Sequence, residues 1–307
     1  MTKIYFVVLN WNRKTDTIEC LKSIDRLRIP SDYEVKTILV DNGSTDESVA
    51  SIGKLTSPVF RLVETKENLG FSGGNNFGIK LALEEGADWV VVINNDTLID
   101  RNFLVNLAKY LLQDSRVGII SPKIYFAPGF EFHKDRYQKA LEGSVIWSAG
   151  GKMDWDNVFG VNVGVDDVDR GQFDEVREID FATGACLIIK GEVFKKVGLF
   201  DGKYFMYFED ADFIKRALNK GIIVKYCPKL YIWHKVAQSS KIGGDLNDYF
   251  ITRNRLRFAS KYVPAKVKAS LFKESVRLLL SGRSWQKKGV LDFLLGRLEK
   301  GSWKTKY

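Results

Sequence analysis

The sequence predicts an α/β protein with a parallel-rich sheet flanked by helices, followed by a basic, helical C-terminal extension. Short, branched apolar runs alternate with helix-like segments in the first third of the 307 residues. Repeated strand–helix units of this kind build a parallel sheet. After residue 246 the pattern becomes helical and rich in lysine and arginine.

A regular alternation of elements is expected up to residue 126. Strands are expected at residues 4–9, 35–40, 60–63 and 89–93. Helices are expected around residues 18–24, behind a capping box formed by Ser44 and Glu47, and through residues 79–83 up to Gly86.

The rest of the chain is less regular. Residues 127–180 are rich in glycine and aspartate and lack a helical period. This favours loops and short strands, which we expect to lie over the edge of the sheet where a ligand would bind. Strands are then expected at residues 181–189, 222–226 and 230–234. Helices are expected at residues 193–197, from the segment 204–212 up to residue 221, at 265–280 and at 290–298.

Composition excludes several classes of protein. A content of 45% apolar and 28% charged residues is typical of a globular chain and excludes a disordered or fibrous one. Apolar runs such as residues 89–93 are much shorter than the roughly 20 residues of a membrane span. The N-terminus lacks signal-peptide features, and the three cysteines are too far apart for a disulfide framework. We therefore expect a cytoplasmic protein.

The net charge of +9 is concentrated at the C-terminus. Lysine and arginine number 15 against 16 acidic residues in residues 1–126, and 17 against 18 in residues 127–245. Residues 246–307 carry 15 against 4. A near-neutral body with a basic attachment is not the pattern of a nucleic-acid-binding fold, so no nucleic-acid partner is expected.

Polar residues follow three of the expected strands. Asn10 and Asp41 close the first two, and Asn94, Asn95 and Asp96 close the fourth. Because ligands bind at the carboxyl ends of parallel strands, we expect these side chains at one edge of the sheet. A carboxylate beside amides can hold a divalent cation when a substrate phosphate completes the shell. Individually, such residues are also common turn formers and helix caps.

The densest acidic cluster is Glu209, Asp210 and Asp212, which lies among aromatic residues. Apolar walls raise the proton affinity of a carboxylate, as general-base catalysis requires. The structural alternative is that the helix dipole stabilises charges in the first turn. We favour the catalytic interpretation.

Two further features concern ligands. Residues 66–76 form a glycine-rich turn that matches neither the dinucleotide fingerprint nor a P-loop, but its glycines permit close approach to a nucleotide. His234 ends an expected strand, where a lone histidine is usually structural. It becomes a ligand candidate if the fold brings it to Asp96.

Five motifs occur in an order that resembles the family-two glycosyltransferases, in particular a rhamnosyltransferase-like branch that builds surface polysaccharides. The resemblance extends from the N-terminus to about residue 258. The motifs are Val7-Val-Leu-Asn-Trp-Asn12, Leu39-Val-Asp-Asn-Gly-Ser-Thr-Asp46, Glu67-Asn-Leu-Gly-Phe-Ser-Gly-Gly-Asn-Asn76, Asn94-Asn-Asp-Thr97, and Thr183-Gly-Ala185 with Phe205-Met-Tyr-Phe-Glu-Asp-Ala-Asp212.

The resemblance implies a GT-A fold and transfer of a sugar, with inversion, from a nucleoside diphosphate in a single displacement. It implies one domain of residues 1–250, with a nucleotide-binding half (1–126) and an acceptor-binding half (127–250). Residues 251–307 are then a basic amphipathic extension.

The resemblance also implies roles for individual residues on the donor side. Asp41 matches the residue that binds the donor base, and Asn10, Asn68 and Asn95 lie where the nucleotide is held. Asp96 matches the last residue of an Asp-x-Asp motif for Mn²⁺ or Mg²⁺, whose first position is Asn94 here. His234, with Ser239 five residues later, resembles a histidine that joins the metal or the diphosphate.

On the other side of the reaction, Asp210 matches the catalytic base of the family. Glu209, Trp147, Gly184 and Arg253 are expected near the acceptor. The implied partners are a nucleoside-diphosphate sugar, such as dTDP-rhamnose or a UDP-sugar, and a surface-polysaccharide or polyprenyl-diphosphate-linked glycan.

Two alternatives remain at this point. A sugar-phosphate nucleotidyltransferase would share the sheet, but its glycine-rich loop is expected after the first strand. A non-catalytic membrane-surface scaffold would use the basic tail and leave Asp96 and Asp210 without a role.

The tail itself predicts a location. Residues 253–307 place basic residues among apolar ones, including Phe258, Leu271 and Phe272. Basic amphipathic helices lie on anionic membranes, so we expect a peripheral protein at the inner face of the cell membrane. The alternative is a helical lid whose basic face is solvated.

Overall fold

The computed structural model describes residues 1–55, 60–236 and 244–304, so that Ser239 lies outside the described residues. The strands are β1 (Thr2–Asn10), β2 (Tyr33–Asp41), β3 (Phe60–Glu64), β4 (Trp89–Asn94), β5 (Thr97–Ile99), β6 (Val117–Phe126), β7 (Ile146–Ala149), β8 (Gly151–Asp154), β9 (Phe159–Asn162), β10 (Arg177–Glu178), β11 (Cys186–Lys190) and β12 (Ile223–His234). The α-helices are α1 (Lys14–Asp25), α2 (Ser48–Ile52), α3 (Gly70–Glu84), α4 (Phe103–Gln113), α5 (Gly191–Val197), α6 (Glu209–Asn219), α7 (Asp245–Tyr262), α8 (Ala265–Ser281) and α9 (Ser284–Leu294).

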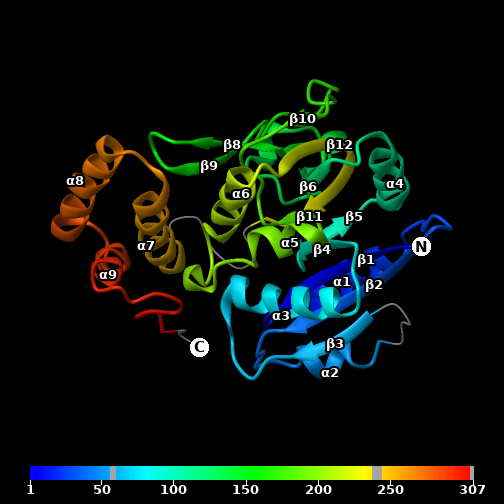
Figure 1. Cartoon of the computed structure of the whole chain (residues 1–307), viewed down its shortest axis with the longest axis horizontal. Helices are drawn as coiled ribbons and strands as arrows, with labels where there is room; N and C mark the ends of the chain where they lie inside the picture. The colour runs from blue at the N-terminus through cyan, green and yellow to red at the C-terminus, as the bar shows by residue number, and fades with distance from the viewer. Residues whose placement is uncertain (56–59, 237–243, 305–307) are drawn as a thin grey trace.

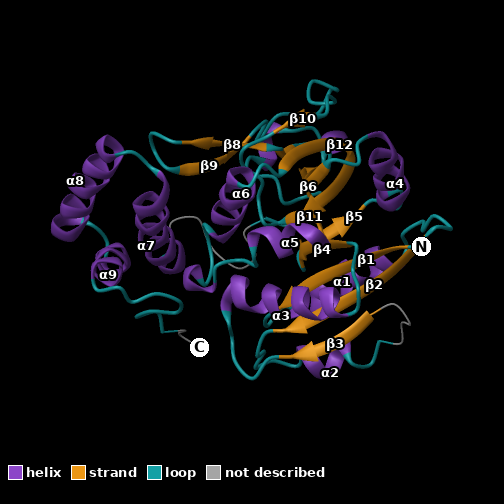
Figure 2. Ribbon diagram, viewed as in Figure 1, coloured by secondary structure: helices purple, strands orange, loops and turns teal. Residues whose placement is uncertain are grey.

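One large sheet organises the described part of the chain (Figure 2). Its strand order is β10-β12-β6-β11-β4-β1-β2-β3, with β5 on β12 and β7 on β6. Strand β1 pairs in parallel with β2 and β4, and β2 pairs in parallel with β3. Strand β11 is antiparallel to both of its neighbours, β4 and β6. The predicted parallel-rich sheet is therefore confirmed.

The core forms two layers because successive strand residues point to opposite faces of the sheet. In β1, Ile4 and Phe6 face one cluster with residues of α1 and α4, whereas Tyr5 and Val7 face another with residues of α3, α5 and α6. Helices thus cover both faces and hold the strand ends in fixed positions.

Helices α7, α8 and α9 form a separate group at one end of the sheet (Figure 1). The inner residues of this group are core residues: Phe258 on α7 and Leu271 on α8 are buried with Phe208 and Ala211. Helix α7 also runs continuously through the expected domain boundary at residues 250 and 251. No element begins or ends there.

Local hydrogen bonds and one glycine conformation explain three differences from the expected elements. The strand expected from residue 181 begins only at Cys186, because Gly184 donates its N–H to Asp210 instead of pairing in the sheet. Ser44 forms no capping box with Glu47, because α2 begins only at Ser48 and the hydroxyl oxygen of Ser44 accepts from the N–H of Asn12 instead. The helix expected at residues 290–298 ends already at Leu294, because Gly296, two residues later, adopts a φ of +67° that terminates the helix.

Two further differences concern strands and their neighbours. The strands expected at residues 222–226 and 230–234 are one strand, β12, with a register shift between Cys227 and Tyr231. The structure also adds β5, α4 and β6 between residues 97 and 126. The middle segment consists of loops and short strands, as expected. None of the helices in the described residues has the length and apolar character of a membrane span.

Candidate active site

Two adjoining cavities open at the carboxyl ends of the parallel strands. The first, of about 410 Å³, is lined by Asn42, Asn68, Asn94 and Asn95 and is called the asparagine cavity here. The second, of about 380 Å³, contains Glu209 and Asp210 and is called the carboxylate cavity. The two share the side chains of Phe71, Asn94, Asp96 and Met206. The sequence-predicted polar residues therefore meet at one edge, as the parallel sheet requires.

Asn10 and Asp41 form a buried pair behind the asparagine cavity. They are register partners at the ends of β1 and β2, and Asn10 Nδ2 donates to Asp41 Oδ2 at 2.7 Å. The N–H of Ser44 donates to the other carboxylate oxygen at 2.8 Å. Because Asp41 is buried and already accepts these bonds, it fixes the 41–44 turn in this structure. Direct contact of Asp41 or Asn10 with a nucleotide stays a prediction.

Asn68 lines the asparagine cavity, and a hydrogen bond with the neighbouring Asn42 holds it there. Asn42 Nδ2 donates to Asn68 Oδ1 at 3.1 Å, and Asn42 Oδ1 accepts from the N–H of Leu69 at 3.0 Å. Gly70 follows with a φ of +72°, and a Cβ there would collide with the carbonyl oxygen of Phe205. The glycine-rich turn is thus clamped between β2 and the segment that precedes α6.

The fold brings the side chain of His234 next to that of Asp96, which was the condition for His234 to be a ligand candidate. The Oδ1 of Asp96 lies 3.0 Å from the Nε2 of His234, and both side chains are largely buried. The ring of Trp147, on β7, packs edge-on against the imidazole at 4.7 Å between centroids. Asn95, by contrast, donates to the hydroxyl of Thr17 at 2.8 Å, which orients the turn behind Asp96.

The donor set at this pair fits a divalent cation that a diphosphate would help to coordinate. A carboxylate oxygen and an imidazole nitrogen suit Mn²⁺, and a Mg²⁺ or Mn²⁺ site commonly uses only one or two protein ligands with substrate phosphates. The Nδ1 of His234 is buried without a hydrogen-bond partner, so the ring has spare bonding capacity. Within the described residues, no group of three potential side-chain ligands gathers anywhere.

Asp210 lies in the first turn of α6 and lines the carboxylate cavity together with Asp96 and His234. Its Oδ2 accepts from the N–H of Gly184 at 2.9 Å, and its Oδ1 accepts from the N–H of Ala211 at 2.8 Å. Burial raises the pKa of Asp210, and these amide hydrogen bonds oppose the rise. The result is a fixed carboxylate whose proton affinity is increased, as a general base needs.

Glu209 is the more strongly perturbed of the two adjacent carboxyl groups. Burial and the nearby charge of Asp210 raise the pKa of Glu209 well above its usual value. Its Oε2 is buried without a hydrogen-bond partner and its side chain lines the carboxylate cavity. A protonated Glu209 beside an ionised Asp210 is the arrangement that best avoids two adjacent buried charges.

Asp212 and Arg253 do not belong to the site. Asp212 faces away from it and accepts hydrogen bonds from Arg216 and Lys261. The expected acceptor contact of Arg253 is wrong, because this side chain is completely buried in α7. Its guanidinium donates to the carbonyl oxygen of Tyr204 at 3.0 Å and packs on the ring of Phe250. Arg253 therefore fastens α7 to the segment before α6.

The C-terminal segment contributes a wall that the sequence did not reveal. The lining of the asparagine cavity includes Trp285, Trp303 and Lys304 of this segment, together with Trp11. The rings of Trp285 and Trp303 are 4.6 Å apart. Ser302 holds this segment by donating its N–H and its hydroxyl to Asp292. In the sequence these tryptophans are only aromatic residues in a basic tail.

Comparison with known sequences finds a family model and several similar proteins. The sequence profile of Glycosyl transferase family 2 matches residues 5–198. The chain is 25% identical over 247 residues to the "Low-salt glycan biosynthesis hexosyltransferase Agl10" of Haloferax volcanii, covering 80% of this chain and 73% of that protein. It is 27% identical over 223 residues to an "N-acetylglucosaminyl-diphospho-decaprenol L-rhamnosyltransferase" of Mycobacterium tuberculosis, covering 70% and 71%.

Solved structures share the fold. The structure of GalNAc-T7 with UDP, GalNAc and Mn²⁺ superposes with a TM-score of 0.67 at 15% identity, covering 96% of this chain and 55% of that one. The mannosyltransferase PcManGT from Pyrobaculum calidifontis, with GDP-Man and Mn²⁺, gives a TM-score of 0.53 at 16% identity, covering 99% and 88%. The mixed sheet flanked by helices is thus the GT-A fold.

Proposed function

Because this chain belongs to glycosyl transferase family 2, we propose that it transfers a sugar, with inversion and with the help of a divalent cation, from a nucleoside diphosphate to a hydroxyl of a lipid-linked or polysaccharide glycan. The observation that carries the proposal is that the Asp96–His234 pair and Asp210 line one and the same cavity. A leaving diphosphate needs charge stabilisation on one side of the sugar, and the attacking hydroxyl needs a base on the other.

The asparagine cavity is the proposed place of the nucleotide. Its lining offers the amide groups of asparagine side chains and the rings of Trp285 and Trp303, on which a base can stack. Lys304 adds a positive charge to the same lining. At the border with the carboxylate cavity, Asp96 and His234 would hold Mn²⁺ or Mg²⁺. When bound, the cation would stabilise the negative charge on the leaving diphosphate.

Asp210 is the proposed base that receives the proton of the attacking hydroxyl. Two backbone amides fix its carboxylate, and the absence of a side chain at Gly184 lets the ring of Phe71 approach closely beside it. Glu209 and Trp147 line the same cavity and are proposed to orient the acceptor. A single base suffices for a direct displacement with inversion, because no covalent sugar–enzyme intermediate is formed.

The acceptor and donor classes follow from the relatives. A relative from Mycobacterium tuberculosis is named for a sugar diphosphate on decaprenol and for rhamnosyl transfer, and two structural neighbours contain UDP or GDP-Man. We therefore propose a dTDP-rhamnose or UDP-sugar donor and a polyprenyl-diphosphate-linked or polysaccharide acceptor. Membership of the family favours this function over a nucleotidyltransferase or a scaffold.

The outer face of α8 supports a location at an anionic membrane surface. Phe272 and Leu280 are 64% and 76% exposed, and Val276 lies between them one helical turn from each. Lys268 lies on one side of this stripe, and Lys273 and Arg277 lie on the other. An exposed apolar stripe flanked by cations is suited to an anionic bilayer. Phe258 and Leu271, which face the protein core, take no part.

A direct experiment tests the function. The protein is incubated with Mn²⁺, a glycan-diphosphate-lipid acceptor and, in separate reactions, thymidine, uridine and guanosine diphosphate sugars, and release of the nucleoside diphosphate is measured. The proposal expects acceptor-dependent release with at least one donor. Absence of release with every donor, or release of pyrophosphate from a nucleoside triphosphate and a sugar phosphate, would overturn it.

A further inference from the structure

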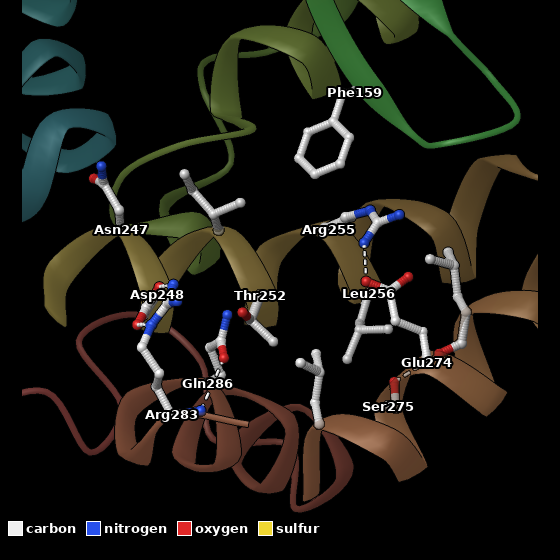
Figure 3. A pocket seen from close by; sticks show the side chains of 13 residues that line it. Phe159, Asn247, Asp248, Thr252, Arg255, Leu256, Glu274, Ser275, Arg283 and Gln286 are labelled. Carbon is white, nitrogen blue, oxygen red and sulfur yellow. Dashed lines mark hydrogen bonds and ion pairs between the residues drawn. The ribbon is translucent and has the colours of Figure 1, made fainter. Parts of the chain in front are cut away.

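A third cavity, separate from the two described above, lies between the C-terminal helices (Figure 3). This interhelical cleft has a volume of about 290 Å³ and is formed by α7, α8 and α9 together with Phe159 of β9. Its apolar lining consists of Phe159, Ile251, Leu256, Leu271 and Leu278. The cleft is thus a largely hydrocarbon surface within an otherwise basic extension.

The polar groups around the interhelical cleft already have partners. Arg255 Nη1 pairs with Glu274 Oε1 at 2.8 Å, and the guanidinium of Arg255 lies 4.5 Å from the ring centre of Phe159. Arg283 forms an ion pair with Asp248 at another side of the cleft. Ser275 donates its hydroxyl to the carbonyl oxygen of Leu271 at 2.8 Å. A ligand in the interhelical cleft would therefore make mainly apolar contacts.

The interhelical cleft adjoins the carboxylate cavity at Asn247. This residue, in the first turn of α7, lines both cavities. The hydroxyl of Tyr207, which also lines the carboxylate cavity, donates to Asn247 Oδ1 at 2.7 Å. The apolar cleft therefore begins next to the cavity that contains Asp210, with Asn247 common to the two linings.

We propose that the interhelical cleft binds the first isoprenoid units of the lipid to which the acceptor sugar is attached. This inference rests on the lipid-linked acceptor of the proposed function. A sugar diphosphate on a polyprenol is polar at one end and purely hydrocarbon at the other, which is the order in which the carboxylate cavity and the cleft occur. The volume lies at the lower limit of the about 300–1,000 Å³ typical of small-molecule pockets, so the cleft holds only the proximal part of the chain.

The position of α8 is consistent with this route. Leu271 and Leu278 on its inner face line the interhelical cleft, whereas Phe272, Val276 and Leu280 form the exposed stripe on its outer face. One helix therefore separates the proposed lipid site from the proposed membrane contact. A polyprenyl chain that leaves the bilayer beside α8 would reach the cleft after a short path, and burial of its methylene groups there favours binding.

The test compares two soluble acceptors with the same sugar diphosphate head, one with a butyl tail and one with a farnesyl tail, in the absence of membranes. Wild-type protein is expected to show a KM at least tenfold lower for the farnesyl acceptor. In Leu278→Trp, which fills the cleft, this preference should disappear while kcat for the butyl acceptor is retained. Ser270→Trp introduces the same residue on an exposed position of α8 and should keep the preference.

Equal KM values for the two tails in wild-type protein, or a full preference in a folded Leu278→Trp, would overturn the inference. If Leu278→Trp does not fold, Ile251→Trp on the facing helix provides the same test. Turnover of the butyl acceptor tests the proposed function independently of the cleft. Calorimetric binding of farnesyl diphosphate tests the cleft without any transfer: binding that Leu278→Trp removes supports the inference, and no binding to wild-type protein contradicts it.

Discussion

The Nε2 of His234 lies 3.0 Å from the Oδ1 of Asp96, although 138 residues separate them in the chain. The last residue of β12 pairs with Thr97 of β5, and this pairing brings the imidazole beside the turn that follows β4. A carboxylate and an imidazole held in this way form a preorganised half-site for a cation, and a bound diphosphate can supply further ligands. We therefore expect cation binding to be coupled to donor binding.

Replacement of Asp96 tests this coupling. In Asp96→Ala, transfer should fall by at least a hundredfold, because the leaving diphosphate loses its stabilising charge. Titration calorimetry with the nucleoside diphosphate should show weaker binding than wild type when Mn²⁺ is present and unchanged binding in excess chelator. His234→Ala should give a smaller effect in the same direction. Wild-type activity in excess chelator would contradict a cation-dependent reaction.

The pH dependence of turnover tests Asp210 as the base. Only the ionised carboxylate can accept a proton, so kcat/KM should fall as pH decreases through the raised pKa of Asp210, above the usual 3.8. Asp210→Asn should reduce turnover by roughly a hundredfold or more and leave donor affinity intact. Glu209→Gln should retain much more activity. Normal turnover in Asp210→Asn, with an inactive Glu209→Gln, would show that the base is Glu209.

The buried carboxyl group of Glu209 should make stability depend on pH. Its pKa is raised in the folded protein above the usual 4.5, so the folded state binds this proton more tightly than the unfolded state. Stability from this group is fully present below the unfolded pKa and is lost as pH rises through the folded pKa. Thermal unfolding of Glu209→Gln should therefore show a gain in Tm relative to wild type at pH 8 that is absent near pH 4. The same difference at both pH values would argue against a raised pKa.

The aromatic wall of the asparagine cavity should contribute to donor affinity. Trp303→Ala removes a ring on which the donor base can stack, and base–aromatic stacking is typically worth about 1–3 kcal/mol, so the donor Kd should rise about tenfold. Lys300→Met changes an exposed residue of the same segment and serves as the control. Fluorescence or calorimetric titration with the nucleoside diphosphate measures both. An unchanged Kd in a folded Trp303→Ala would place the base elsewhere.

The outer face of α8 should determine membrane binding. The protein should sediment with vesicles that contain an anionic lipid, not with neutral vesicles, and salt should reverse the binding. Combined replacement of Phe272, Val276 and Leu280 by serine should abolish sedimentation. Leu112→Ser removes an equally exposed apolar residue on α4 and should have no effect. Binding to both kinds of vesicle, or to neither, would exclude the proposed surface.

The parts of the fold that could be predicted depend on local sequence. The four parallel strands of the first half are short segments rich in branched apolar residues, and the polar residues at their ends meet at one edge of the sheet. Local rules failed where two structures compete for one group. The hydroxyl oxygen of Ser44 can accept from the first turn of a helix or from the N–H of Asn12, and the sequence does not show that the second bond is formed.

The parts of the site that could not be predicted depend on tertiary packing. A basic residue such as Arg253 is expected at the surface, but here the carbonyl oxygen of Tyr204 and two aromatic rings compensate its burial. Trp303 reaches the asparagine cavity only because Asp292 binds Ser302 and turns the chain end back. By contrast, the sequence alone identifies Asp96, His234 and Asp210 as candidates, because they lie at the ends of elements or in recognisable motifs.

The stereochemistry of transfer tests the central claim most directly. With the donor that turns over and a glycan acceptor, NMR spectroscopy of the first product formed measures the configuration of the new anomeric centre. A single displacement assisted by Asp210 predicts the configuration opposite to that of the donor, and Asp210→Asn should form the same product far more slowly. A product with retained configuration would contradict the mechanism proposed for this site.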